Sequence, residues 1–403
     1  MSRPILIIGG GLGGLCLAQA LRKHNIPFKL FEKDAEIDYR PQGYRLRISE
    51  DGIYALQYAL TPEIYTLFEQ TCAAGLAIGV QVKPDGSPVD AARRIGPPPM
   101  KGPKPYTVDR TIFRKVLLTG LKDDVFFGKA LDHYTLHDDK VSAHFTDGSV
   151  EDGAILVGAD GVRSRVRKQL IPGAKVVDTG MRALYGKTPI TPEFLARFPE
   201  QYQRGMNIAI DDSVPEGQVY LLFEATWFPN ADTVSEPELP SPYVYWVLGA
   251  HSSRLGVPDE KLLSLSNDEA ADLAIQVTES WSPGLRAVFE MQGKGQASML
   301  RISSAPLDLP VWEVSPRVTL LGDAIHVMPP TGALGLVTAL RDSADLARKI
   351  VDAGGIENVD RSVIGNYESE MRDFAKMALG RSWQSGLKTF GLRPVEECEM
   401  VDM

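Results

Sequence analysis

Residues 5–14 read Ile-Leu-Ile-Ile-Gly-Gly-Gly-Leu-Gly-Gly, an apolar run that ends in a glycine-rich turn. The run shows no alternation of polar and apolar side chains, which is typical of a strand buried on both faces of a parallel sheet. Residues 15–23 then place apolar side chains at helical spacing, and residues 28–32 are again typical of a buried strand. The order strand, tight turn, helix, strand predicts an α/β unit.

The spacing of the glycines predicts that this turn binds a dinucleotide. Gly9 permits a tight turn, Gly11 lets the backbone approach a pyrophosphate, and Gly14 lets the helix pack closely against the strand. The N-terminus of the helix also supplies oriented N–H donors. The predicted contacts from this segment are Gly9, Gly11, Leu12, Gly13 and Gly14. A turn whose glycines serve only packing is the alternative.

Glu32 ends the second predicted strand, near the spacing of about 20 residues at which a carboxylate accepts a hydrogen bond from a ribose hydroxyl. A carboxylate at this position disfavours a 2′-phosphate. The bound dinucleotide is therefore expected to be FAD or NAD rather than NADP.

The composition describes an ordinary enzyme of 403 residues, with 44% apolar and 24% charged residues, which is long enough for two packed units. The net charge of −9 and the absence of a Lys/Arg block argue against nucleic-acid binding. Cys16, Cys72 and Cys398 are too scattered for a disulfide framework or a metal site, so no metal and a cytoplasmic location are expected. No apolar stretch approaches the roughly 18 residues of a membrane span, so no membrane anchor is expected.

Two further segments follow buried strands in the pattern. Residues 160–167 read Asp-Gly-Val-Arg-Ser-Arg-Val-Arg after the apolar strand 155–157, and residues 322–330 read Gly-Asp-Ala-Ile-His-Val-Met-Pro-Pro after the strand 318–321. Together with the glycine turn, and in this order, they resemble the motifs of the flavoprotein aromatic hydroxylases. This class A flavoprotein monooxygenase family includes para-hydroxybenzoate hydroxylase. The resemblance covers nearly the whole chain, and three coordinated motifs are far more specific than one.

The resemblance implies a fold. The expected class is α/β, a Rossmann-like FAD-binding domain with an inserted antiparallel-sheet substrate domain and C-terminal helices. Residues 1–178 and 298–355 would form the discontinuous FAD-binding domain. Residues 179–297, whose strand-like segments are rich in aromatic side chains, would form the substrate domain, and residues 356–403 the C-terminal helical region.

The resemblance also implies roles for individual residues. Asp323 would hold a hydroxyl of the ribityl chain of a noncovalent FAD. Backbone N–H groups near the start of the next helix would approach the edge of the flavin ring, with Gly332, Gly335 and Leu336 among the contacts. Asp160 would lie near the pyrophosphate and assist nicotinamide nucleotide binding. The remaining expected roles are cofactor contacts by Arg45 and Arg110 and local support by Arg163 and Arg167.

Several side chains leave two interpretations open. Arg45 and Arg47 share one side of a strand if residues 43–47 form one, and either could touch cofactor or substrate, or only a surface partner. They are the candidates for a catalytic role, which otherwise stays unassigned. His326 is expected to be structural rather than a general base. Core packing is favoured over pocket lining for the aromatic residues Tyr220, Tyr243, Tyr245 and Trp246.

The family mechanism implies an FAD-dependent monooxygenase that hydroxylates a small aromatic or polycyclic substrate through a flavin hydroperoxide, using O2 and NADPH or NADH. Epoxidation or Baeyer–Villiger oxygen insertion, an FAD-dependent reductase, and a non-catalytic flavin-binding sensor are the alternatives. The aromatic sheet and the absence of clustered basic residues suggest a neutral, hydrophobic substrate of specialised metabolism. A monomer or a homodimer is expected.

Overall fold

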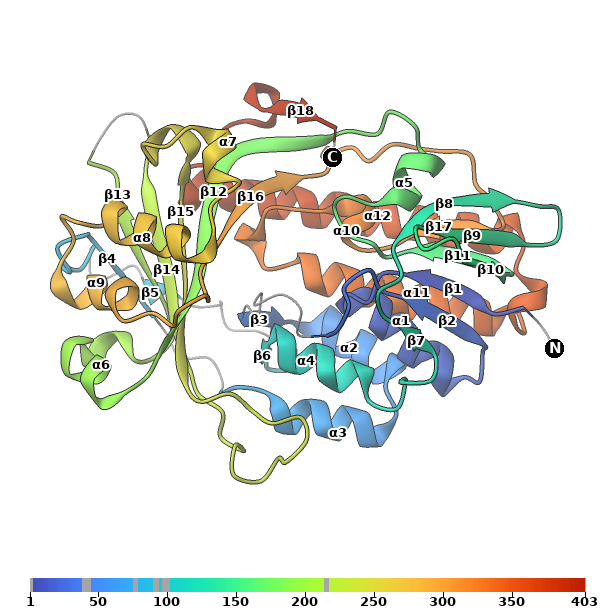
Figure 1. The fold of residues 1–403 in the computed structure, drawn as a ribbon, viewed down its shortest axis with the longest axis horizontal. Helices are drawn as coiled ribbons and strands as arrows, with labels where there is room; N and C mark the ends of the chain where they lie inside the picture. Colours follow the sequence, from blue (N-terminus) through green and yellow to red (C-terminus); the bar gives the residue numbers. More distant parts are fainter. Residues whose placement is uncertain are drawn as a thin grey trace.

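The computed structural model describes residues 3–37, 45–74, 79–89, 94–95, 102–213 and 217–402. Two bodies stand side by side, with the N-terminal strands in one of them and a tall sheet in the other (Figure 1). Between them lies a two-stranded sheet, formed by β3 (Arg45–Ile48) and β6 (Tyr106–Asp109). The expected α/β fold class is confirmed.

The first body is built on a parallel sheet of strand order β17-β11-β1-β2-β7. The strands are β1 (Ile5–Ile8), β2 (Phe28–Phe31), β7 (Val125–Phe126), β11 (Ile155–Gly158) and β17 (Val318–Leu320). Every residue of β1, β11 and β17 is buried, as their unbroken apolar sequence predicts. Strand β17 joins this sheet about 160 residues after β11, so the large intervening segment is an insertion in the first body.

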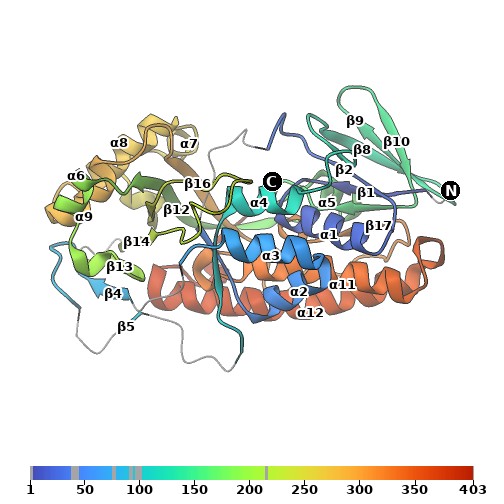
Figure 2. The same cartoon turned by 90° about the horizontal axis from the view of Figure 1, so that it is seen from below.

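Helices cover one face of the parallel sheet (Figure 2). The longer ones are α1 (Leu12–Lys23), α2 (Glu50–Ala59), α3 (Pro62–Thr71), α4 (Arg110–Leu118), α11 (Gly335–Asp352) and α12 (Arg361–Ser385). Helix α11 packs against α1, α2 and α12 (Figure 2). The approach of α1 and α11 is close, because the Ser343 hydroxyl donates to the Gly13 carbonyl at 2.8 Å.

Smaller elements complete this body. They are the short helices α5 (Arg165–Leu170) and α10 (Asp323–His326) and the antiparallel strands β8 (Leu131–Leu136), β9 (Val141–Phe145) and β10 (Val150–Gly153). Each of the two helices begins within one of the later sequence motifs. Both motifs therefore lie at the carboxyl end of the parallel sheet, beside the β1–α1 turn.

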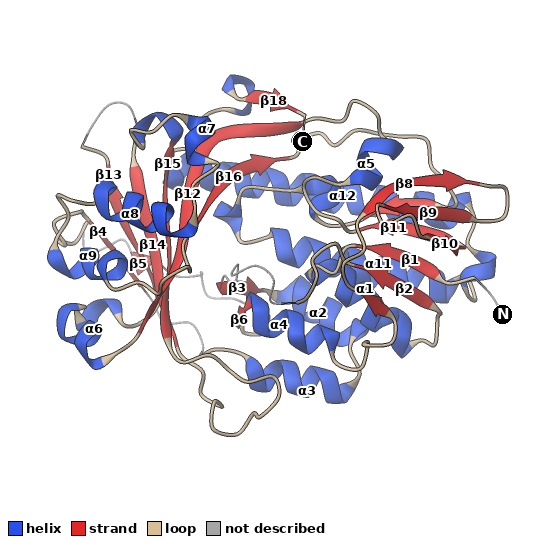
Figure 3. Cartoon of the chain, in the orientation of Figure 1, coloured by secondary structure: helices blue, strands red, loops and turns tan. Residues whose placement is uncertain are grey.

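The second body is an eight-stranded sheet (Figure 3). It contains β4 (Gly79–Val82), β5 (Arg94–Ile95), β12 (Val176–Pro189), β13 (Met206–Asp211), β14 (Val219–Thr226), β15 (Tyr243–His251), β16 (Ser298–Ser304) and β18 (Glu399–Val401). Its pairings are antiparallel except that of β4 with β13. Strands from outside residues 179–297 thus join the sheet at both edges.

The two faces of this sheet have different partners. The outer face packs Trp246 and Phe223 against α6 (Pro192–Arg197), α7 (Asp259–Leu262), α8 (Asn267–Val277) and α9 (Pro283–Glu290). The inner face turns toward β3 and β6. On it Lys187, Tyr245 and Glu224 lie side by side on three neighbouring strands, because Tyr245 is in register with both of the others.

Candidate functional site

The β1–α1 turn has the geometry that close backbone approach requires. Gly9 has φ +115°, and a Cβ there would lie 2.3 Å from the Ala159 carbonyl oxygen. A Cβ at Gly14 would lie 2.1 Å from the Gly9 carbonyl oxygen, so both positions exclude side chains. At Gly11, by contrast, a Cβ would meet no atom within 4 Å. Open space thus faces the start of α1, where no side chain caps the first amides.

The Glu32 side chain is buried and holds this turn from the end of β2. Its Oε2 accepts a hydrogen bond from the Gly10 amide at 2.7 Å, and its Oε1 accepts one from the Asp34 amide at 2.9 Å. Arg114 lies 3.4 Å from the same carboxylate and donates to the Gly10 carbonyl at 2.7 Å. Sequence reasoning missed Arg114, although its place one helical turn after Arg110 on α4 was a usable signal.

Asp323 is the first residue of α10, shortly after the end of β17. Gly322 precedes it with φ 61° and ψ −145°, a conformation that only glycine adopts easily. The Asp323 side chain is accessible to water. Desolvation by the surrounding protein nevertheless raises its pKa, and this effect outweighs the attraction of His326 and Arg110, which lowers the pKa. The Asp323 carboxylate receives no hydrogen bond from the described part of the chain. An accessible but desolvated carboxylate is expected where a ligand hydroxyl completes the site.

His326 is fully buried beneath this turn. Its Nε2 lies 2.5 Å from Oδ2 of Asp342 on α11, and the same oxygen accepts a hydrogen bond from the Gly322 amide at 2.9 Å. Because the His326 side chain has no access to solvent and shares Asp342 with the Gly322 amide, it supports the turn. The geometry therefore agrees with the structural interpretation of His326.

The Asp160 motif is tied to the Asp323 motif. Asp160 accepts from the Ser164 hydroxyl at 2.5 Å and from the Arg165 amide at 2.7 Å, and burial raises its pKa. Arg167 donates to the carbonyls of Ala324 and Val162, both at 2.7 Å, and so links the two turns. Arg163 is exposed on the same loop.

The start of α11 also lacks a side-chain cap, so its first amides are available to a ligand. Gly335 opens the helix, and Leu336 lies in its first turn. Gly332 precedes it in the short helix η3 (Pro330–Gly332), where a Cβ would lie 2.6 Å from the Ser382 hydroxyl. The absence of a side chain at Gly332 therefore also serves packing against α12.

A junction cluster of five charged residues connects the inner face with β3 and β6. Its members are Arg45, Arg47, Asp109, Lys187 and Glu224. Arg45 pairs closely with Glu224, and Lys187 lies 2.6 Å from Oδ2 of Asp109. The Tyr243 hydroxyl donates to that same oxygen at 2.8 Å. Sequence reasoning identified both arginines but missed the other three members, which lie far apart in the chain and belong to no motif.

The four aromatic residues singled out in the sequence lie on different faces of the eight-stranded sheet. Tyr220, Tyr243 and Tyr245 belong to the inner face, whereas Trp246 packs edge-on against Phe289 on the outer face. Gly43 and Tyr44, which precede Arg45 in the pattern, lie outside the described residues.

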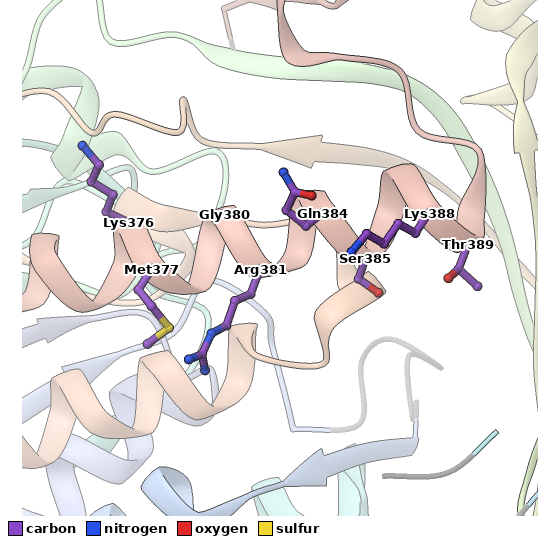
Figure 4. A pocket seen from close by; sticks show the side chains of 8 residues that line it. All are labelled: Lys376, Met377, Gly380, Arg381, Gln384, Ser385, Lys388 and Thr389. Carbon is purple, nitrogen blue, oxygen red and sulfur yellow. The ribbon is translucent and has the colours of Figure 1, made fainter. Parts of the chain in front are cut away.

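A separate groove follows α12, far along the chain from these motifs. It is lined by Lys376, Met377, Gly380, Arg381, Gln384, Ser385, Lys388 and Thr389 (Figure 4). The Ser385 hydroxyl donates to the Thr331 carbonyl at 2.8 Å, so the groove adjoins η3. None of the acids of the motifs lines it.

Known proteins resemble the chain in sequence and in structure. A family model described as FAD binding domain matches residues 312–382, and one described as NAD(P)-binding Rossmann-like domain matches residues 7–60. An FAD-dependent monooxygenase of Trichoderma harzianum is 28% identical over 97% of this chain and 95% of its own. The crystal structure of an FAD-containing monooxygenase from Photorhabdus luminescens is 28% identical, with a TM-score of 0.78, over 95% of this chain and 97% of that one.

The chain resembles FAD-dependent monooxygenases in sequence and in fold. The expected resemblance is thereby confirmed. A dual O-methyltransferase/FAD-dependent monooxygenase of Phaeosphaeria nodorum is 38% identical over 99% of the chain. The chain spans 47% of that relative, about half its length.

FAD, the cofactor of class A flavoprotein monooxygenases, fits the residues present. The open space at Gly11 and the uncapped amides of α1 suit a pyrophosphate, and the accessible carboxylate of Asp323 suits a polyhydroxy chain. The described residues contain no group of three His, Cys, Asp or Glu side chains placed to hold a metal ion. Across the same described ranges, none of the helices combines the length and apolar character needed to cross a bilayer.

Proposed function

We propose that this chain is an FAD-dependent monooxygenase that adds one oxygen atom to a small aromatic or polycyclic molecule, using O2 and NADPH or NADH. One observation carries the proposal. The free amides of α1, the unpartnered carboxylate of Asp323 and the free amides of α11 all lie at the carboxyl end of one parallel sheet, facing the inner face of the second body.

In this proposal each group of the chain has a defined task. The amides beside Gly11 hold the pyrophosphate, together with Leu12, Gly13 and the nearby Asp160. Glu32 accepts a hydrogen bond from a ribose hydroxyl. Its carboxylate has acceptor positions left beyond those that the Gly10 and Asp34 amides use. Asp323 accepts a hydrogen bond from a ribityl hydroxyl, and the positive charge of Arg110 attracts the Asp323 carboxylate. Noncovalent FAD, when bound, supplies the redox chemistry that activates O2.

The remaining groups orient the reactants and exclude water. The amides at Gly335 and Leu336 favour negative charge at the edge of the reduced flavin ring. The inner face presents buried tyrosines opposite this edge, and the Tyr243 hydroxyl is fixed by Asp109. The apolar rings of these tyrosines help to exclude water from the reacting atoms.

The relatives support a phenolic substrate of specialised metabolism. The Phaeosphaeria nodorum protein combines an O-methyltransferase with an FAD-dependent monooxygenase in one chain, and our chain matches about half of it. Activities joined in one polypeptide commonly act on the same compound. Because O-methylation requires a free hydroxyl, we infer that the substrate is a phenol or its methyl ether.

The test begins with the colour of the purified protein. We expect yellow protein that releases FAD on denaturation, and consumption of O2 with NAD(P)H that a panel of phenols and their methyl ethers stimulates. The product should contain one atom from isotopically labelled O2. An apoprotein that takes up NAD but never flavin contradicts the proposal, and NAD(P)H oxidation without O2 consumption favours a reductase.

A further inference from the structure

The junction cluster carries one more positive than negative charge. Arg45, Arg47 and Lys187 are its cations, and Asp109 and Glu224 are its carboxylates, so three cations meet two anions. All five side chains are buried or nearly so. A surplus charge in such a place is costly unless a partner balances it.

Asp109 is fully committed to other groups. Its Oδ1 accepts hydrogen bonds from the amides of Thr111 and Ile112 at the start of α4. Its Oδ2 accepts from Lys187 at 2.6 Å and from Tyr243 at 2.8 Å. Asp109 thus balances Lys187 and has no capacity left for the arginines.

Glu224 is shared unequally between the two arginines. Arg45 makes a close ion pair with its Oε2, whereas Nη2 of Arg47 lies 3.4 Å from both carboxylate oxygens. Contacts of that length are weak. Arg47 is therefore the surplus cation of the cluster.

The surroundings of Arg47 leave one of its donors without an acceptor. Its Nε is buried and has no hydrogen-bond acceptor among the described residues, and its side chain is 13% exposed. Burial, followed by repulsion from Arg45, lowers its pKa to about 10, against the attraction of Glu224. The tyrosine nearest to the cluster offers no anion, because burial and Asp109 raise the pKa of Tyr243 well above its usual value.

We propose that Arg47 binds an ionised oxygen of the substrate, so that the enzyme selects a phenolate or an aryl carboxylate over a neutral aromatic molecule. The inference rests on the proposed function and specifies its substrate. Nε and an Nη of a guanidinium present two parallel donors, which suits a carboxylate or a single ionised oxygen. Arg47 lies on β3, between the inner face and the body that carries Asp323.

This inference departs from the neutral substrate that the sequence suggested. Arg45 and Arg47 are close together in the sequence, but Lys187 lies far along the chain and no local pattern groups all three. The pairing of β3 with β6, and the approach of both to the inner face, bring them together.

The first experiment compares matched ligands on the FAD-loaded enzyme, by the change in flavin absorbance on titration. The pairs are 3-hydroxy-2-naphthoate with its methyl ester, and 2-naphthol with 2-methoxynaphthalene. We expect the wild type to prefer the acidic member of at least one pair by about tenfold or more, the size of a charge-assisted hydrogen bond. A preference in the first pair identifies a carboxylate, and one in the second pair that grows with pH identifies a phenolate.

Arg47→Met should reduce that preference to near unity while the affinity for the neutral members is kept. Equal affinities within both pairs in the wild type, or an unchanged preference in Arg47→Met, would overturn the inference. The FAD content of each sample is measured first. A protein without FAD refutes the proposed function, whereas an FAD-loaded protein without the preference refutes only this inference.

The second experiment separates a binding role of Arg47 from a structural one, without any substrate. Arg45→Met is the matched control on the same strand. We expect Arg45→Met to lower the midpoint of thermal unfolding, because it leaves Glu224 without its close partner. Arg47→Met should leave the midpoint unchanged or raise it, since it removes a surplus charge. If the midpoint falls as much in Arg47→Met as in Arg45→Met, Arg47 serves a structural ion pair with Glu224 and the inference is wrong.

Discussion

His326 and Asp342 form a buried pair, in which Nε2 of the histidine lies 2.5 Å from Oδ2 of the carboxylate. Both side chains are almost without exposure, and the same oxygen receives the Gly322 amide. The pair thereby fixes the turn that carries Asp323. We expect His326 to act by holding this turn, beside the proposed cofactor ligand Asp323, rather than by transferring a proton.

The buried pair predicts a pH-dependent stability. Burial lowers the pKa of His326, but the attraction and hydrogen bond of Asp342 outweigh it, so the pKa in the folded protein is raised. The stabilisation is then fully present below the usual histidine pKa of about 6.5 and is lost as the pH rises through the folded value. We expect His326→Gln to lower the thermal unfolding midpoint more at pH 6 than at pH 9. An equal fall of the unfolding midpoint at both pH values would mean that His326 is not protonated to the cation in the folded protein.

Asp323→Asn should have opposite effects on the apoprotein and on FAD binding. Desolvation raises the pKa of Asp323, so the ionised carboxylate costs stability at neutral pH when no ligand is present. The amide removes that cost but also the charge that favours a ligand hydroxyl. Calorimetry of the apoprotein should show a raised midpoint, and FAD titration a weakened affinity. A lowered apoprotein midpoint would indicate that Asp323 serves the fold.

Asp323→Ala should lower FAD occupancy and uncouple NADPH oxidation from oxygenation, because the ribityl chain loses its acceptor. His326→Ala should retain both properties in the fraction that folds, although the unpaired Asp342 lowers stability by about 3–5 kcal/mol. The measurements are the ratio of FAD to protein and the yield of hydrogen peroxide per NADPH. The assignment of this motif is wrong if only His326→Ala abolishes turnover while Asp323→Ala keeps flavin and coupling.

Gly11→Val should abolish FAD retention without unfolding the protein. A Cβ at Gly11 meets no protein atom and its φ of −74° suits any residue, so the added side chain fills only the space proposed for the pyrophosphate. Gly14→Ala is the control, because its Cβ would lie 2.1 Å from the Gly9 carbonyl and should impair folding itself. Circular dichroism with FAD titration distinguishes the two effects. Full FAD occupancy in a folded Gly11→Val protein would place the cofactor elsewhere.

Glu32→Ala should weaken FAD binding by about 1–3 kcal/mol, the size of a lost charge-assisted hydrogen bond. The structure adds that Arg114→Met should weaken it as well, since Arg114 holds the Gly10 carbonyl and faces Glu32. Equilibrium dialysis of FAD against both variants measures the effect. Unchanged affinity in both would leave Glu32 with a purely structural role.

The sequence by itself determined the parallel sheet, the glycine turn and the two later motifs, because each depends on residues that are close together in the chain. An apolar run without alternation specifies a strand buried on both faces, and Gly9 and Gly14 are required by contacts within or next to the turn. The family resemblance followed from the order of such local signals.

Only the tertiary structure decided how the charges are distributed. Arg114 meets Glu32 across 82 residues, and Glu224 meets Arg45 across 179. Tyr245 and Trp246 point to opposite faces as neighbours in any strand do, but only the folded chain decides which of the two faces turns toward the first body. Interactions of this kind depend on strand register and on the approach of two bodies, which no local pattern encodes. The surplus positive charge at Arg47 is therefore a property of the assembled junction, because the nearby carboxylates in the described part of the chain are committed by contacts that exist only in the folded protein.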